Sequence, residues 1–166
     1  MDKSGVNFDK IKILSGKWTG FGIARYPAIK TEEYFEELEF TANEESSFLH
    51  YEQKTWIKNE KGKFEKPVFW ETGFLRALEE EDSFELCNAQ KSGRIEVLLG
   101  KLFKKNDTNY LDFKSKIFAN DLKLIDTSRK FKFNDKELSY ELWMSTKNNK
   151  NFDIHLNADL KKVPHK

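Results

Sequence analysis

The chain has few side chains of the kinds that bind metals or act as nucleophiles. It contains one cysteine, Cys87, and three histidines, His50, His155 and His165. Structural zinc sites typically use pairs of these residues at short spacing, and no such pair occurs here, so the sequence predicts no Cys/His zinc cluster. Haem is the common metal centre that needs only one protein ligand, because the porphyrin supplies the other four. A histidine-poor chain can therefore still hold iron.

His155 stands in the segment "FDIHLNADL" near the end of the chain, where a neutral imidazole could serve as the protein ligand of a haem iron. Simple strand alternation, however, groups it with Asp153, Asn157 and Asp159 and against the apolar residues of the segment. This pattern predicts a histidine that faces outward. Only a β-bulge, or a place at the mouth of a barrel, would turn the imidazole toward an interior cavity.

The other candidates for chemistry are expected to have structural roles. His50 lies on the face of its segment opposite Leu49 and Tyr51, which predicts a solvent-facing position, and His165 belongs to a polar tail. The acidic runs are expected to be solvated faces and a turn, because charges are rarely buried. These runs are Glu32-Glu33, Glu36-Glu37 and Glu79 to Asp82. Neither a G-x-x-x-x-G-K-[ST] loop nor a G-x-G-x-x-G between a strand and a helix occurs.

A series of strands must position these side chains. Phe8, Ile11 and Leu14 recur at helical spacing before Gly16 and predict a short helical opener. After the first strand, segments with strand patterns alternate with short turn-like separators. They are "EEYFEELEF", "FLHYEQKTWI", "PVFWETGFLRAL", "SFELCNAQ", "RIEVLLGKLF", "YLDFKSKIF", "LKLIDTSRKFKF", "ELSYELWMS" and "FDIHLNADLKKV". The sequence therefore predicts an all-β fold, a ten-stranded antiparallel up-and-down barrel that can enclose one small ligand.

The first strand contains the stretch "LSGKWTGFGIARYP", in which Gly16, Gly20 and Gly22 share one face with Trp18. Glycine weakens a strand because it packs nothing. A face stripped of side chains bends sharply or lets another backbone, a ring or a ligand approach closely. We interpret the stretch as the bent first strand of the barrel, with Trp18 packed inside near one end. An ordinary glycine-rich bend is the alternative interpretation.

Length and composition limit the class of protein. Residues 1–166 are expected to form a single domain, because this length allows a full core without disulfides or metals. Lys and Arg total 29 against 28 Asp and Glu, so the net charge of +1 predicts no general attraction to nucleic acid or to membranes. The lone cysteine excludes an intramolecular disulfide. The sequence holds no apolar leader or membrane-spanning run. These features predict a cytoplasmic protein.

A series of motifs resembles one family. The segment "GKWTGFG" fits the G-x-W-x-G-x-G signature of the nitrobindins, small haem-binding barrels related in shape to fatty-acid-binding proteins and lipocalins. The similarity continues in order through Tyr26-Pro27, "YFEELEF", "YEQKTW", "ETGFLR", "NAQKSGRIEVLLG", "SRKF", "LSYELWMST" and "HLNADLKK". It covers nearly the whole chain. Lipocalins also carry an early G-x-W, but the later motifs do not belong to them.

The resemblance implies one haem b per chain, held near an open end of the barrel. The histidine of the closing "HL" strand is the axial ligand in the family, and that position is His155. Lys123 corresponds to a lysine that contacts haem in relatives, and Met144 to a methionine that borders the pocket. Val68 and Phe69, just before the "ETGFLR"-like segment, are also implied to contact the cofactor. Family members bind nitric oxide and are described as converting peroxynitrite to nitrate.

Two positions depart from the family pattern. Ala28 stands where relatives usually have a threonine assigned to haem contact, and Phe69 stands where they usually have a histidine on the distal side. Phe69 can neither donate a hydrogen bond nor relay a proton, so distal chemistry is expected to be slower or absent.

Two functions from different classes follow. The first is a haem protein that binds nitric oxide and isomerises peroxynitrite to nitrate at a His155-ligated iron. The alternative is a non-enzymatic barrel that has lost haem and binds a fatty acid or another apolar small molecule. Either function predicts a small-molecule ligand, with the chain acting as a monomer or a homodimer.

Overall fold

A computed structural model describes residues 3–26, 29–43, 45 and 47–164 of the chain. Within these ranges the chain forms α1 (Ser4–Ile11), a 3₁₀ turn η1 (Lys12–Leu14) and the strands β1 (Gly16–Tyr26), β2 (Ile29–Asn43), β3 (Phe48–Lys58), β4 (Phe64–Ala77), β5 (Ser83–Gln90), β6 (Ile95–Lys105), β7 (Thr108–Ala119), β8 (Leu124–Phe133), β9 (Glu137–Thr146) and β10 (Asp153–Lys162). None of the described helices is long and apolar enough to cross a membrane.

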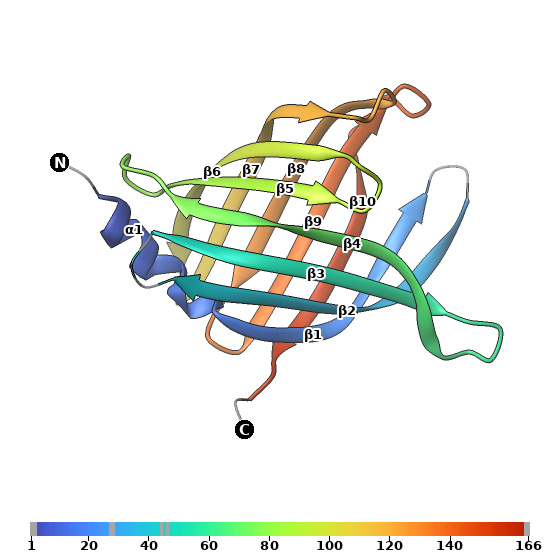
Figure 1. The fold of residues 1–166 in the computed structure, drawn as a ribbon, viewed down its shortest axis with the longest axis horizontal. Helices are drawn as coiled ribbons and strands as arrows, with labels where there is room; N and C mark the ends of the chain where they lie inside the picture. Colours follow the sequence, from blue (N-terminus) through green and yellow to red (C-terminus); the bar gives the residue numbers. More distant parts are fainter. Residues whose placement is uncertain (1–2, 27–28, 44, 46, 165–166) are drawn as a thin grey trace.

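The ten strands follow chain order around a closed barrel, and β1 pairs with β10 to complete it. Every neighbouring pair is antiparallel. Closure satisfies the backbone groups that an open sheet would expose at its edges. The predicted ten-stranded antiparallel up-and-down barrel and its helical opener are confirmed (Figure 1).

The connections define two ends of the barrel. Those after β1, β3, β5, β7 and β9 lie at one end, which we call the mouth. The remaining connections and α1 lie at the other, which we call the helix end (Figure 1). The side-chain amide of Asn7 attaches α1 to the turn after β4: Nδ2 donates to the carbonyls of Leu78 and Glu80 at 2.8 Å, and Oδ1 accepts the Asp82 N–H.

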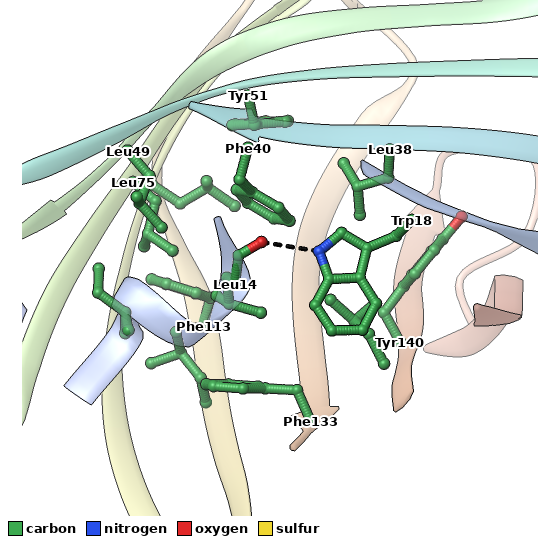
Figure 2. Close-up of a cluster of buried hydrophobic side chains, with 14 of the residues drawn as sticks. Leu14, Trp18, Leu38, Phe40, Leu49, Tyr51, Leu75, Phe113, Phe133 and Tyr140 are labelled. Carbon is green, nitrogen blue, oxygen red and sulfur yellow. Dashed lines mark hydrogen bonds between the residues drawn. The ribbon is translucent and has the colours of Figure 1, made fainter. Parts of the chain in front are cut away.

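The barrel core begins beneath α1. Phe8, Ile11 and Leu14 are buried, as their helical spacing predicts, and the Trp18 indole lies beside them. Trp18 Nε1 donates to the Leu14 carbonyl at 2.7 Å, so the indole packs inside the barrel without leaving its N–H unpaired (Figure 2). Inward-facing apolar side chains fill the space beyond. The cavity that remains among them encloses about 20 Å³, room for roughly one water molecule.

The glycines of β1 permit close approach of neighbouring groups. A Cβ atom at Gly20 would lie 2.1 Å from the Asp159 carbonyl oxygen on β10, and one at Gly22 would lie 2.3 Å from the Tyr34 ring. Gly20 therefore meets a backbone, whereas Gly22 makes room for an aromatic ring. The contacts favour the close-approach interpretation over an ordinary glycine-rich bend.

One acidic residue differs from its expected environment. Glu36 was predicted to lie on a solvated face, but its side chain is 0% exposed inside the barrel. Gln53 Nε2 donates to Glu36 Oε1 at 3.0 Å, and the Tyr140 hydroxyl donates to Oε2 at 2.6 Å. Burial raises the pKa of Glu36 to about 8, despite these two hydrogen bonds. The prediction was wrong because the period-two pattern places Glu36 on the inner face together with Tyr34 and Leu38.

Candidate functional site at the barrel mouth

His155 faces the inside of the barrel. Its register against β9 shifts between Ile154, which opposes Trp143, and Leu156, which opposes Leu142. His155 is the extra residue of this β-bulge, which breaks the alternation of the strand and directs the imidazole inward. The side chain is 8% exposed. Simple alternation predicts the wrong face, and the bulge that could reverse it is present.

The imidazole of His155 is prepared to act as a ligand. Its Nε2 is buried and has no hydrogen-bond partner among the described residues. Burial, with a smaller contribution from the Arg94 cation, lowers the pKa of His155 below 6.5, although Asp153 acts in the opposite direction. The ring is therefore neutral at pH 7, the state in which a histidine nitrogen can bind a metal.

The two strands beyond β10 bring further side chains to the mouth. Met144 on β9 pairs across the sheet with Asp153 and with Thr127 on β8. Thr127 is buried, and its Oγ1 also lacks a hydrogen-bond partner. An unpaired buried polar atom costs about 1–3 kcal/mol, and one in a native structure needs an explanation such as a bound group. The unpaired atoms of His155 and Thr127 thus point to the mouth as a ligand site.

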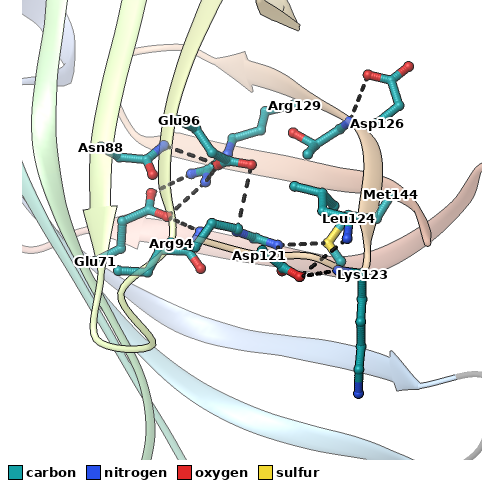
Figure 3. Close-up of polar contacts among 12 residues, drawn as sticks. Glu71, Asn88, Arg94, Glu96, Asp121, Lys123, Leu124, Asp126, Arg129 and Met144 are labelled. Atoms are coloured by element: carbon teal, nitrogen blue, oxygen red, sulfur yellow. Dashed lines mark hydrogen bonds and ion pairs between the residues drawn. The ribbon is translucent and has the colours of Figure 1, made fainter. Parts of the chain in front are cut away.

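Arg94 enters the mouth from the start of β6. Its side chain is buried, and its guanidinium Nη1 lies 3.5 Å from Asp121 Oδ2 and 3.5 Å from Met144 Sδ. Nε lies 3.7 Å from Glu96 Oε1 and makes no hydrogen bond. Figure 3 shows Arg94 close to Asp121 and Met144. The side chain therefore reaches across the barrel interior to residues of β9 and of the turn after β7.

A second buried arginine lies deeper and is tightly paired. Arg129 Nη2 lies 2.7 Å from Glu71 Oε2 and 2.9 Å from Glu96 Oε2, and Nη1 also contacts Glu71. Tyr51 donates its hydroxyl to Glu71 at 2.6 Å. Burial opposes the charge of Arg129, but Glu71, Glu96 and Tyr51 together outweigh it and raise the Arg129 pKa well above its usual value. The positive charge of Arg129 is committed to these carboxylates.

The remaining predicted site residues occupy different places. Phe69 is half-buried on the inward-facing register of β4, which it shares with Glu71. β4 is four strands from β10 in one direction round the barrel and six in the other, so Phe69 lies on a wall far from His155. Val68 is 38% exposed. Lys123 is exposed, and Figure 3 shows its side chain extending away from the Arg129 cluster. Ala28 lies outside the described residues.

The three histidines also separate clearly. His50 is on the outside of β3, where its Nε2 lies 2.9 Å from Thr72 Oγ1 and its ring contacts Phe74. His165 lies outside the described residues. Within the described part of the chain, His155 is the histidine directed into the barrel.

The family described as the THAP4-like, heme-binding beta-barrel domain matches residues 7–162. The chain belongs to this family. A protein named peroxynitrite isomerase Rv2717c from Arabidopsis thaliana is 35% identical over 153 residues, which cover 92% of this chain and 87% of that relative. Peroxynitrite isomerase 1 of Mycobacterium tuberculosis (strain ATCC 25618 / H37Rv) is 32% identical over 139 residues, 79% of this chain and 80% of the relative.

The fold of a solved relative agrees with this assignment. The crystal structure of Rv2717c from M. tuberculosis matches with a TM-score of 0.84 and 28% identity, over 95% of this chain and 98% of that one. The resemblance to nitrobindins is thereby confirmed, since a ferric nitrobindin-like protein of Thermobifida fusca is also 31% identical over 105 residues, 57% of this chain and 58% of that relative.

The residues at the mouth fit a haem group. The donor set offers one neutral, buried imidazole nitrogen without a competing partner, which matches the single protein ligand that a haem iron requires. No group of three or more His, Cys, Asp and Glu side chains suited to a bare metal ion occurs among the described residues. The chemistry of the mouth thus favours haem over a metal ion held by protein ligands alone.

Two residues of the mouth were not singled out from the sequence, Arg94 and Thr127. A signal for the first was present in "GRIEVLLG", where Arg94 and Glu96 precede Leu98 at period two, so two charges share a strand face with an apolar residue. Such charges on an inward-facing register indicate a buried ion pair or a site. Thr127 offers no comparable signal, because threonine is common on either face of a strand.

Proposed function

We propose that this chain binds haem b at the barrel mouth with His155 as the axial ligand, and that it binds nitric oxide and isomerises peroxynitrite to nitrate. Membership of a heme-binding family and the names of the relatives support the class of cofactor and reaction. The observation that carries the assignment of the ligand is the buried, unpaired Nε2 of His155 at a β-bulge. We further propose one haem per chain and a cytoplasmic location.

The protein side of the mechanism follows from the mouth residues. The haem iron, when bound, supplies an open coordination position that acts as Lewis acid and template for the anion. His155 provides one neutral nitrogen and is held in place by the bulge in β10. Phe69 supplies an apolar surface on β4 that gives no proton. Nitric oxide needs little help from hydrogen bonds, so an apolar wall is compatible with its binding.

The barrel interior does not favour the alternative of a fatty-acid carrier. The interior cavity encloses about 20 Å³, whereas pockets for small molecules are commonly about 300–1,000 Å³. Arg129, the deeper of the two buried arginines, is already paired with Glu71 and Glu96.

The test is a haemin titration of the wild type, His155→Ala and His50→Ala. We expect the wild type and the His50→Ala control to develop the same Soret band, with a five-coordinate or weakly hydrated ferric iron. His155→Ala should lose that band or bind at least about tenfold more weakly, as expected for loss of the one protein ligand. If His155→Ala retains the wild-type Soret position and affinity, the axial assignment fails. Tight binding of a fatty acid without any Soret band would instead support the apolar-ligand barrel.

A further inference from the structure

Arg94 is a buried cation without a close partner. Its three polar contacts with side chains span 3.5–3.7 Å: Asp121 Oδ2, Met144 Sδ and Glu96 Oε1. Hydrogen bonds from a guanidinium to a carboxylate are normally about 2.7–2.9 Å. A thioether sulfur is also a weak acceptor. The N–H groups of Arg94 that have a side-chain partner therefore make only long, weak contacts.

Arg129 provides a matched comparison in the same barrel, because both arginines face Glu96. Glu96 Oε2 lies 2.9 Å from Arg129 Nη2, whereas Glu96 Oε1 lies 3.7 Å from Arg94 Nε and has no hydrogen-bond partner. The carboxylate is thus mainly committed to Arg129. Nε is unpaired in both arginines, but the terminal nitrogens of Arg129 make short bonds to carboxylates, whereas Nη1 of Arg94 makes only 3.5 Å contacts. Arg94 is therefore the arginine that can better pair with another acceptor.

Asp121 does not fully neutralise Arg94. Its side chain is 30% exposed, so water screens its charge. Its Oδ1 accepts the backbone N–H groups of Lys123 and Leu124 and so stabilises the turn after β7. Oδ2, the atom nearer Arg94, makes only the 3.5 Å contact. Asp121 can therefore keep its hydrogen bonds to the turn when another anion pairs with Arg94.

The position of Arg94 relates it to the proposed ligand. Its guanidinium contacts Met144, which is paired with Asp153, two residues before His155. The positive charge of Arg94 also contributes to the lowered pKa of His155. Thr127, whose hydroxyl is also unpaired, is the neighbour of Met144 on the other side. The cation thus lies inside the mouth, in contact with the strand that pairs with the strand carrying His155.

We propose that Arg94 is the anion-recognition residue of the mouth, pairing with an oxyanion or other small anion held beside His155. The anion is either a propionate carboxylate of the haem or an anionic ligand at the iron such as peroxynitrite. The proposal rests on the proposed haem function and adds to it a residue that determines charge selectivity. Asp121 is the internal competitor that occupies Arg94 weakly when no other anion is bound.

The test uses the whole chain and the variants Arg94→Met, Arg94→Lys and Asp121→Asn, free of haem for the haemin titrations and loaded with ferric haem for the iron ligands. Two pairs of probes distinguish the sources of the anion. Haemin is compared with haemin dimethyl ester, which lacks the propionate charges, and azide is compared with neutral imidazole as ligands of the ferric protein. Each dissociation constant is measured by absorbance titration, which needs no turnover.

If the anion is a propionate, Arg94→Met should weaken haemin binding roughly tenfold, the scale of one lost charge-assisted hydrogen bond, and leave the dimethyl ester unchanged. If the anion is an iron ligand, Arg94→Met should weaken azide binding roughly tenfold and leave the affinity for imidazole unchanged. Arg94→Lys should retain part of the affinity. Asp121→Asn should increase the affinity for the affected anion, because the amide oxygen preserves the turn and the substitution removes the competing charge.

The inference is overturned if folded Arg94→Met shifts the charged and neutral probe of each pair equally or not at all. It is also overturned if Asp121→Asn weakens anion binding as much as Arg94→Met does, since Arg94 and Asp121 would then act only as a structural ion pair. These outcomes differ from failure of the proposed function. Failure of the proposed function is seen in a different comparison, when the haemin titrations of the wild type and of His155→Ala give the same result.

Discussion

The two ends of the barrel differ in how completely they pair their buried polar groups. At the helix end, Asn7 uses both atoms of its amide, and the Trp18 indole donates to a carbonyl. At the mouth, His155 Nε2, Thr127 Oγ1 and Arg94 Nε have no hydrogen-bond partner. Full pairing stabilises a fold, whereas unpaired groups that the rest of the structure holds in place mark a functional region. The helix end therefore maintains the barrel, and the mouth is where a ligand is to be expected.

Replacing the two buried arginines is the strongest way to test this contrast. Arg129→Met should cost about 3–5 kcal/mol, because it leaves Glu71 as a buried charge without a cation and Glu96 with only its 3.7 Å contact to Arg94. Arg94→Met should cost about 1 kcal/mol or less, since its contacts are long and Asp121 is partly solvated. Urea unfolding of the protein without haem measures both. Equal losses of stability would show that the mouth is as tightly paired as the interior.

A second test replaces the apolar ring of Phe69 on β4 with an imidazole that can donate a proton. General acid–base assistance contributes roughly 10²–10⁴-fold where proton transfer limits a rate, and peroxynitrite isomerisation requires little of it. We therefore expect Phe69→His to accelerate peroxynitrite decay by about 100-fold at most. Stopped-flow mixing of the haem-loaded variants with peroxynitrite is the measurement, with Phe69→Leu as an apolar control. A faster rate in Phe69→Leu would point to steric access and not to a proton donor.

The close approach of β1 and β10 predicts a smaller loss of stability. Gly20→Val should destabilise the fold by about 1–3 kcal/mol, because its Cβ would overlap the Asp159 carbonyl. Gly5→Ala in α1 is the control: a Cβ there meets nothing within 4 Å, and alanine favours a helix. Thermal or urea unfolding compares the two variants. Unchanged stability in Gly20→Val would contradict the close-approach interpretation.

Glu36 predicts a pH dependence of stability that belongs to the interior and not to the mouth. Its folded pKa of about 8 lies above the unfolded value of 4.5, so the folded protein binds the extra proton between these values. Stability from this group is complete below about pH 4.5 and is lost as the pH rises toward 8. The slope is at most about 1.4 kcal/mol per pH unit.

The Glu36 effect dominates from pH 6.5 to 8, because the lowered pKa of His155 leaves the folded imidazole neutral there. The unfolded His155 loses its remaining proton just above pH 6.5, and this contribution has the opposite sign and fades as the pH rises. Urea unfolding of the wild type should show stability falling across the window, and Glu36→Gln should remove most of the slope. A wild type whose stability is flat from pH 6.5 to 8 would mean that Glu36 is ionised in the folded protein.

Local patterns predicted the strands and the helical opener. Phe8, Ile11 and Leu14 recur at the helical period, and the strand segments alternate at period two, so each element follows from neighbours in the chain. The glycine stretch was also informative: its spacing placed Gly20 and Gly22 on the face of Trp18, and both glycines meet groups that leave no room for a side chain.

The site was less accessible to this reasoning. Alternation predicts the outer face for His155, and the bulge that reverses it depends on how β10 pairs with β9. The burial of Glu36 follows from the same period-two pattern, but acidic composition suggested a solvated run. Arg94 was missed because the residues that it contacts, Asp121 and Met144, are 27 and 50 positions away.

Periodicity and short turns along the chain are enough to predict the strand order and the closed antiparallel barrel, and residue identities are enough to recognise the family motifs. Which charges are buried and which remain unpaired depends on contacts between distant strands. A side chain that crosses a barrel meets partners from distant strands, and a one-residue bulge exchanges the faces of a strand without changing its composition. The inward direction of His155 and the weak pairing of Arg94 both arise in this way.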